Sequence, residues 1–170
     1  MDIKDKQRLE KLKKQNKFKI AKKQLIKMLH TRNHIDISNK VFINYNLSES
    51  IHKKVYERIR EKDIKIEKFC YEYNNANEKL EWIFNKFKLY ENNNILFYPS
   101  TFGIYFRSCN HLYLDFPIAI SSTIKECKDI IYILIHDIFD DLIVAEENLS
   151  YGFIISEDEY QYVSIEYWGI

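Results

Sequence analysis

Glycine is scarce in this chain, which has only Gly103, Gly152 and Gly169 among its 170 residues. Glycine-rich turns bring backbone amides against phosphate groups, so a Walker A loop and a dinucleotide-binding loop are both excluded. The sequence also lacks the GxSxG and HExxH motifs, which are typical of serine hydrolases and zinc proteases. We therefore expect no bound cofactor and no enzymatic activity.

Cysteine and long apolar runs are also scarce. The chain has an odd number of cysteines, Cys70, Cys109 and Cys127, and none of them is in CxxC spacing. This pattern argues against a disulfide framework and a zinc ribbon. The longest aliphatic run, "IIYILI", falls far short of the about 20 residues that span a bilayer, and the first residues lack the apolar core of a signal peptide. These features predict a cytoplasmic protein with no membrane partner.

Apolar and aromatic residues are plentiful. Hydrophobic residues make up 46% of the chain and aromatic residues 15%, so enough apolar surface is available to exclude disorder of the whole chain. A chain of this length fits one domain with a sizeable core. We expect a single domain spanning residues 1–170.

The net charge of +1 conceals a strong segregation along the chain. Residues 1–40 hold 13 basic and 4 acidic residues. Residues 41–108 hold 11 basic and 9 acidic residues, and residues 109–170 hold 2 basic and 12 acidic residues. The net charge therefore runs from +9 through +2 to −10. Such an asymmetry favours a charged partner for one of the two ends.

The first half of the sequence has mainly helical patterns. Residues 2–31 read as one long basic helix, whose second half carries an apolar stripe that should pack, whereas residues 1–17 are either a solvated extension or frayed. "HIDISNKVFINYN" indicates a loop with a short strand. Ser48 is a plausible N-cap for a helix to about Glu61, and Leu80 to Phe87 give another apolar stripe. "IKIEKFCYEY" is ambiguous between strand and helix.

The second half reads mostly as strands. "NILFYPS", "TFGIYFRSCN" and "HLYLDFPIAI" indicate extended segments, in which Pro99 and Pro117 fit an edge, a bulge or a turn. Thr123 and Glu126 resemble a capping box that opens one helix. "DDLIVAE", "YGFIISED" and "YQYVSIEYW" then predict an antiparallel meander. The fold class expected is α+β, with N-terminal helices followed by a mostly antiparallel sheet and one helix packed on it.

The periodicities also predict a set of buried residues between helix and sheet. These are Leu134, Ile138, Ile143, Phe153, Ile155 and Val163.

Two groups of residues are candidates for a metal site or a catalytic site. His30 and His34 would share one face of a continuing helix, as a metal pair requires, but no third ligand lies nearby in the sequence. Arg107, Cys109 and His111 alternate in a possible strand and could pair a thiol nucleophile with a base. Surface histidines at a helix end and a buried structural cysteine are the commoner explanations, so no metal is expected.

The C-terminal stretch combines sheet-like alternation with acidic residues and contains no lysine or arginine. Adjacent acids such as Asp140 and Asp141 point to opposite faces of a strand, which makes them poor partners in acid–base catalysis. Strand propensity explains most of the aromatic residues there, and the others could anchor an interface.

This stretch, "FDDLIVAEENLSYGFIISEDEYQYVSIEYWG", together with "IYFRSCN" and "STIKECKDIIYILIHDI", resembles small bacterial immunity proteins encoded beside polymorphic or contact-dependent growth-inhibition toxins. The shared features are the acidic entry into a strand, "YGFII" and a final aromatic strand ending in "WG". The helical N-terminal half does not take part. The resemblance implies a non-catalytic inhibitor that binds a cognate toxin domain, often a nuclease.

A compact carboxylate surface could occupy the basic cleft of such a nuclease and be steered to it. The expected toxin-binding residues are Asp140, Asp141, Glu146, Glu147, Glu157, Asp158, Glu159, Tyr160, Glu166 and Trp168. The alternative function is a small nucleic-acid-binding module that uses the basic N-terminal helix. Because a solvated helix face is commoner, and the acidic half would repel a polyanion, no direct nucleic-acid partner is expected.

Overall fold

A computed structural model describes residues 3–101, 112–137, 140–157 and 160–170. The fold is α+β, as the sequence predicts, and every strand pair in its seven-stranded sheet is antiparallel. The elements are α1 (Ile3–Asn33), β1 (Val41–Phe42), α2 (Tyr45–Arg58), β2 (Lys65–Cys70), α3 (Tyr73–Lys86), η1 (Lys88–Tyr90), β3 (Asn94–Thr101), α4 (Leu112–Asp115), β4 (Ile120–Thr123), α5 (Ile124–Leu134), η2 (Ile135–Asp137), β5 (Asp141–Ala145), β6 (Gly152–Glu157) and β7 (Tyr162–Trp168). The strand order is β1-β4-β3-β5-β6-β7-β2, so the expected C-terminal meander β5-β6-β7 lies inside the sheet.

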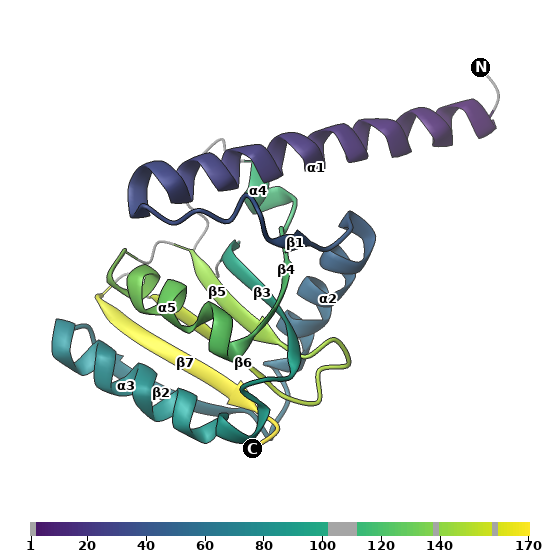
Figure 1. Ribbon diagram of the computed structural model, residues 1–170. Helices are drawn as coiled ribbons and strands as arrows, with labels where there is room; N and C mark the ends of the chain where they lie inside the picture. The colour runs from purple at the N-terminus through teal and green to yellow at the C-terminus, as the bar shows by residue number, and fades with distance from the viewer. Residues whose placement is uncertain (1–2, 102–111, 138–139, 158–159) are drawn as a thin grey trace.

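Helices cover both faces of this sheet rather than one (Figure 1). On one face, the packed half of α1 and the helices α3 and α5 form the larger core with the sheet. On the other face, α2 packs a smaller core through Ile51 and Val55. Besides the one helix that the sequence places on the sheet, the apolar stripes of α1, α2 and α3 are also buried against it.

Side chains alternate between these two cores along each strand. In β5, Leu142 and Val144 face the larger core, whereas Ile143 and Ala145 face α2. Because both faces are covered, β5 is buried at every position, as its apolar run requires. Of the residues expected to be buried, Leu134, Ile143, Phe153, Ile155 and Val163 are buried, and Ile138 lies outside the described residues.

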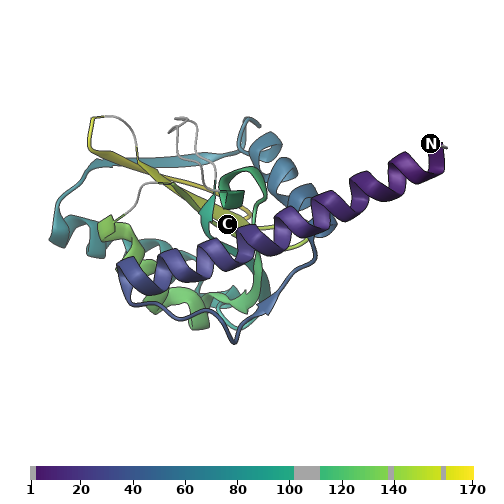
Figure 2. The same cartoon turned by 90° about the horizontal axis from the view of Figure 1, so that it is seen from above.

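Helix α1 is continuous, and only its second half packs. Ala21, Leu25 and Leu29 are fully buried, whereas residues 4–17 are exposed along their whole length. Figures 1 and 2 both show the N-terminal half of the helix extending past the sheet. The helix ends at Asn33 and is followed by His34 in the left-handed region at φ 57°. Of the two alternatives that the sequence leaves open for residues 1–17, the structure has the helical extension from Ile3 onward.

Two local predictions for the second helix and for the segment after β3 are wrong. Asn44, and not Ser48, caps α2 by accepting a hydrogen bond from the N–H of Leu47. Ser48 is buried and donates to the carbonyl of Pro117. Part of "HLYLDFPIAI" forms the short helix α4 instead of a strand, because the alternation of that segment does not by itself determine its backbone.

Other local predictions are confirmed. Pro99 lies between Tyr98 and Thr101, where the register of β3 against β5 shifts, which is a position that tolerates proline inside a sheet. Thr123 caps α5 by accepting a hydrogen bond from the N–H of Glu126. The ambiguous segment around residue 65 is strand β2, which pairs with β7. Among the described residues, no helix is long and apolar enough to cross a membrane.

Candidate functional site: the acidic end of the sheet

Antiparallel pairing gathers one group of carboxylates at a single end of the sheet. The first residues of β5 lie beside the last residues of β3, and the end of β6 lies beside the beginning of β7. We use the term acidic end for Asp137, Asp140, Asp141 and Glu157. Three of the acids in this group were expected from the sequence to bind a partner, and the fold places them together from β5, β6 and the chain before β5.

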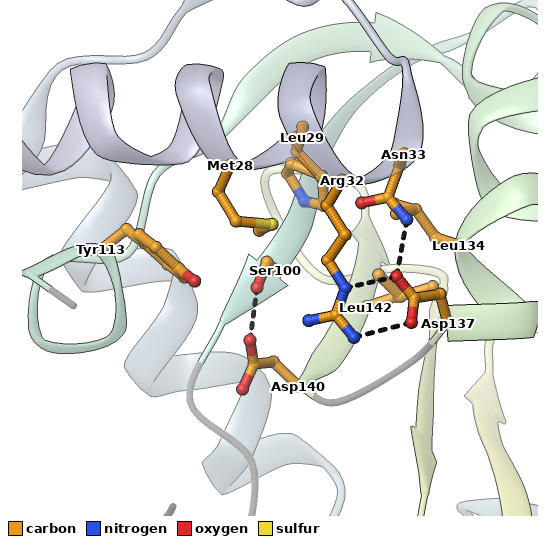
Figure 3. A pocket seen from close by; sticks show the side chains of 11 residues that line it. Met28, Leu29, Arg32, Asn33, Ser100, Tyr113, Leu134, Asp137, Asp140 and Leu142 are labelled. Carbon is orange, nitrogen blue, oxygen red and sulfur yellow. Dashed lines mark hydrogen bonds and ion pairs between the residues drawn. The ribbon is translucent and has the colours of Figure 1, made fainter. Parts of the chain in front are cut away.

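On the α1 side of the acidic end, two carboxylates are held by polar partners (Figure 3). Asp137 forms an ion pair with Arg32, at 2.6 Å between Nε and Oδ2, and accepts a hydrogen bond from the amide of Asn33. Asp140 accepts a hydrogen bond of 2.7 Å from the hydroxyl of Ser100. The C-terminal turn of α1 and the end of β3 therefore fix both carboxylates.

A small cavity lies between these groups. It has a volume of about 40 Å³, and Met28, Leu29, Tyr113 and Leu142 complete its wall. A cavity of this size holds one or a few water molecules. It is too small for an organic substrate, so we do not consider it as a binding pocket for one.

On the α2 side, Asp141 is buried and accepts a hydrogen bond of 2.5 Å from the Tyr56 hydroxyl. Burial raises the pKa of Asp141 to about 7, although the bond from Tyr56 favours the ionised carboxylate. Burial also raises the pKa of Glu166, which is half-buried and is one source of the negative potential at Asp141. Near neutral pH, Asp141 therefore carries only part of a full negative charge.

His52 lies on α2, four residues before Tyr56. Its ring contacts the rings of Tyr56 and Tyr98, at centroid distances of 4.9 and 5.7 Å, and its Nε2 shares a hydrogen bond with the hydroxyl of Thr101. Burial lowers the pKa of His52 to about 4, so the imidazole is neutral at neutral pH. The hydroxyl and imidazole resemble a nucleophile with its base, but Thr101 is fully buried.

The third side of the acidic end is aromatic. The ring of Tyr73 stacks on His136 at a centroid distance of 4.1 Å, and His136 hydrogen bonds to the hydroxyl of Tyr71 and to the side chain of Asn77. Burial lowers the pKa of His136. Burial also raises the pKa of Tyr71, with a smaller contribution from the nearby Glu157 carboxylate. This cluster and Glu157 therefore lie on one side of the acidic end.

Two tyrosines extend this surface. Tyr160 is 77% exposed and Tyr162 is 41% exposed. The exposure of Tyr160 agrees with what an interface anchor requires, because a rigid aromatic side chain provides contact area at low entropic cost; the anchor role itself stays a prediction.

Other expected site residues do not belong to the acidic end. Glu146 and Glu147 lie at the opposite end of the sheet, in the turn between β5 and β6. There the Glu146 carboxylate accepts hydrogen bonds from the N–H of Asn148 and the hydroxyl of Ser150, which lowers its pKa against the opposing effect of burial. Glu146 therefore stabilises a turn.

Trp168 requires a correction. It is 1% exposed, it belongs to the α2-side core, and its indole N–H donates to the carbonyl of Leu149. The expectation that it anchors a partner is wrong, because the alternation of β7 directs its side chain beneath α2.

Several expected residues do not form sites or cannot be placed. His30 lies on α1, but the chain leaves the helix at His34, so the two imidazoles are not presented on consecutive turns of one helix. Asp158, Glu159, Arg107, Cys109 and His111 lie outside the described residues. Within the described parts of the chain, no group of three histidine, cysteine, aspartate or glutamate residues could hold a metal ion.

Sequence reasoning missed the polar partners of the acidic end. Arg32 and Asp137 are far apart in the chain, as are Tyr56 and Asp141, and nothing local pairs them. One signal was present, since His52 and Tyr56 are spaced by four residues directly after the apolar positions Ile51 and Val55. This spacing places both polar rings beside the buried stripe of α2.

The arrangement can present negative charge and aromatic surface in a fixed geometry. Asp140 and Glu157 are half-buried, and Tyr160, three residues after Glu157, is exposed. Such a surface suits a cationic partner, because like-signed groups concentrated at one end raise the local potential. Comparison with known proteins finds no match: no family model fits the chain, and no curated protein or solved structure is significantly similar to it.

Proposed function

We propose that this protein is a non-catalytic bacterial immunity protein that binds and neutralises a cognate toxin domain in the cytoplasm. The partner is a basic domain, with a nuclease as the best fit, and the binding surface is the acidic end with the turn between β6 and β7. The observation that carries the proposal is the convergence of Asp140, Asp141 and Glu157 at one end of the sheet.

Charge complementarity supplies the mechanism. A nuclease attracts a polyanionic substrate with a basic cleft, and a protein surface that concentrates carboxylates can occupy the same cleft. Long-range attraction accelerates the encounter, while hydrogen bonds within the acidic end reduce the entropic cost of ordering its side chains on binding. Ser100 and Asn33 hold Asp140 and Asp137 in this way.

The contribution of each acid differs. The ion pair with Arg32 offsets the charge of Asp137, and Asp141 is buried with a raised pKa. Asp140 and Glu157 are half-buried carboxylates at the rim of the acidic end, and Tyr160 supplies exposed aromatic surface. Asp158 and Glu159 follow Glu157 in sequence and would add to this charge.

The test is a triple charge reversal, Glu157→Lys with Asp158→Lys and Glu159→Lys. The partner is the toxin domain encoded immediately upstream of this gene. We expect the variant to associate more slowly with that domain and to protect cells less, with the largest loss at low salt, because surface charges act mainly through steering. Stopped-flow association rates and growth during toxin expression measure both effects.

The matched control is Glu78→Lys with Glu81→Lys and Asp129→Lys, which changes the net charge by the same amount at exposed positions on α3 and α5. This control should associate nearly as fast as the original protein. Equal association rates for the reversal and the original protein at low and moderate salt would contradict the proposed surface. Loss of binding on deletion of residues 1–17, with silent reversals, would place the interface on α1.

A further inference from the structure

The N-terminal half of α1 forms a free-standing basic helix. We define the basic arm as residues 4–17, all of which are exposed. The arm contains seven basic residues and two acidic ones, Asp5 and Glu10, for a net charge of +5. An isolated helix of this length is marginally stable in water, and like charges within it disfavour the helix further. A polyanionic partner would remove this repulsion.

The cations of the arm surround the helix. At about 3.6 residues per turn, Lys6, Lys13 and Lys17 fall on one side and Lys4, Arg8 and Lys11 fall on the opposite side. None of these six takes part in the ion pairs found among the described residues. The positive charge of the arm is thus not neutralised by the body of the protein.

A groove separates the base of the arm from the beginning of α2. It has a volume of about 670 Å³, and its arm-side wall includes Lys11, Lys14 and Lys19, with Glu10 as the opposing charge. Asn44 and Tyr45 form part of the other wall. Three lysines against one glutamate give the lining of the groove a net positive charge, so a chain of phosphates could bind along its wall.

The arm points away from the acidic end. In Figures 1 and 2 the N-terminus of α1 lies on the opposite side of the molecule from the beginning of β7. The sequence-based objection was that the acidic half would repel a polyanion. Because repulsion between exposed charges is screened beyond roughly 10 Å at moderate salt, the separation of the two surfaces weakens that objection.

We propose that the basic arm binds the phosphate backbone of a nucleic-acid duplex. A helix is about 10–12 Å wide and fits the major groove of B-DNA, which is about 12 Å wide and has phosphates along both walls. Cations on opposite sides of the arm match those two walls, whereas an acidic protein face would contact only one side. The proposal is independent of toxin binding and concerns a different surface.

The test uses full-length protein and a fluorescein-labelled DNA duplex of about 20 base pairs, with fluorescence anisotropy between about 50 mM and 200 mM salt. The original protein should bind, with an affinity that falls steeply with salt. The variant Lys11→Gln with Lys14→Gln and Lys17→Gln should bind about tenfold or more weakly, and its log–log salt slope should be less negative by about 2.7, at about 0.9 per lost phosphate contact.

The matched control removes the same charge from the body, through Lys54→Gln with Lys62→Gln and Lys125→Gln, all at exposed positions. It should bind DNA within about twofold of the original protein if the arm carries the contacts. Equal weakening by both triples, or tighter binding to a single strand than to the duplex, would overturn the proposal. It would also be overturned if DNA failed to bind while light scattering showed a dimer that the arm triple abolishes, because the arm would then contact a second copy.

Discussion

At the scale of single residues, two ionisable groups at the contact between α2 and the sheet have pKa values shifted in opposite directions. Asp141 has a folded-state pKa of about 7 against an ordinary 3.8, and His52 has one of about 4 against an ordinary 6.5. The folded protein therefore binds the Asp141 proton more tightly, and the His52 proton more weakly, than the unfolded chain does. Each shift makes stability depend on pH.

The signs of the two effects are opposite. The folded pKa of Asp141 is raised, so its contribution to stability is complete below about pH 3.8 and is lost as pH rises through about 7. The folded pKa of His52 is depressed, so its contribution is complete above about pH 6.5 and is lost as pH falls towards about 4. Between pH 4 and 6.5 the two slopes nearly cancel.

Single substitutions should separate the two contributions to the pH dependence of the free energy of unfolding. In Asp141→Asn, which keeps an acceptor for Tyr56, the free energy of unfolding should rise with pH by about 1 kcal/mol per unit between about pH 4.5 and 6. In His52→Gln it should fall by a similar amount. Urea unfolding at several pH values measures both profiles, and Glu166 remains in both variants. Parallel profiles for the two variants would contradict the assigned burial of these groups.

At the scale of elements, β6 and β7 are in close contact on the α2 side, at Gly152. Strand β6 begins with Gly152, which pairs with Trp168 of β7. A Cβ atom at Gly152 would lie 2.6 Å from the Trp168 ring and 2.7 Å from the carbonyl oxygen of Val144. The glycine is therefore required for close packing and not for an unusual backbone conformation.

Gly152→Ala should consequently destabilise the protein by about 1–3 kcal/mol, since the indole or the strand must move. The matched control is Ser156→Ala in the same strand, which removes the hydrogen bond to Ser164 at a cost of about 1 kcal/mol or less. Chemical denaturation measures both. Equal stabilities for the two variants would show that the ring can shift at little cost.

At the scale of elements, local sequence patterns predict some helices and strands of this fold but not all of its contacts. Helices α1, α3 and α5 and the meander β5-β6-β7 follow from local periodicity and capping, as at Thr123. Asn44 and Ser48 are both acceptable N-caps, and the choice depends on the contact between Ser48 and Pro117, far away in sequence. Local patterns could not determine that contact.

The candidate site was predictable to a smaller extent. Charge segregation located the acidic C-terminal half, and strand alternation placed its residues on β5, β6 and β7. The exposed or buried state of each acid depends on distant elements, because Tyr56 of α2 covers Asp141 and Arg32 of α1 pairs with Asp137. The burial of Trp168 likewise depends on α2, whose place on the sheet no local pattern indicates.

At the scale of the whole molecule, stability and surface charge are separated in space. The first fully buried residue of α1 is Ala21. The arm, residues 4–17, lies outside the core. Deleting residues 1–17 should therefore change the free energy of unfolding by less than about 0.5 kcal/mol, while reducing the helical circular dichroism signal.

The comparison for this deletion is Leu25→Ala, in the packed half of the same helix. Leu25 is fully buried, and its truncation should cost about 2–5 kcal/mol. Urea unfolding of both proteins measures the contrast. A deletion as destabilising as Leu25→Ala would mean that the arm contributes to folding.

The pairing of β2 with β7 also governs when the chain can finish folding during synthesis. Lys65 pairs with Tyr167 and Cys70 with Tyr162, so β2 emerges from the ribosome long before β7, its only neighbour among the described strands, exists. Until β7 is released, the nascent chain exposes this unpaired strand and the apolar underside of α3. Such long-range pairing slows folding and favours aggregation of incomplete chains. Translation that stalls shortly before β7 should therefore yield a chaperone substrate rather than a nearly complete protein.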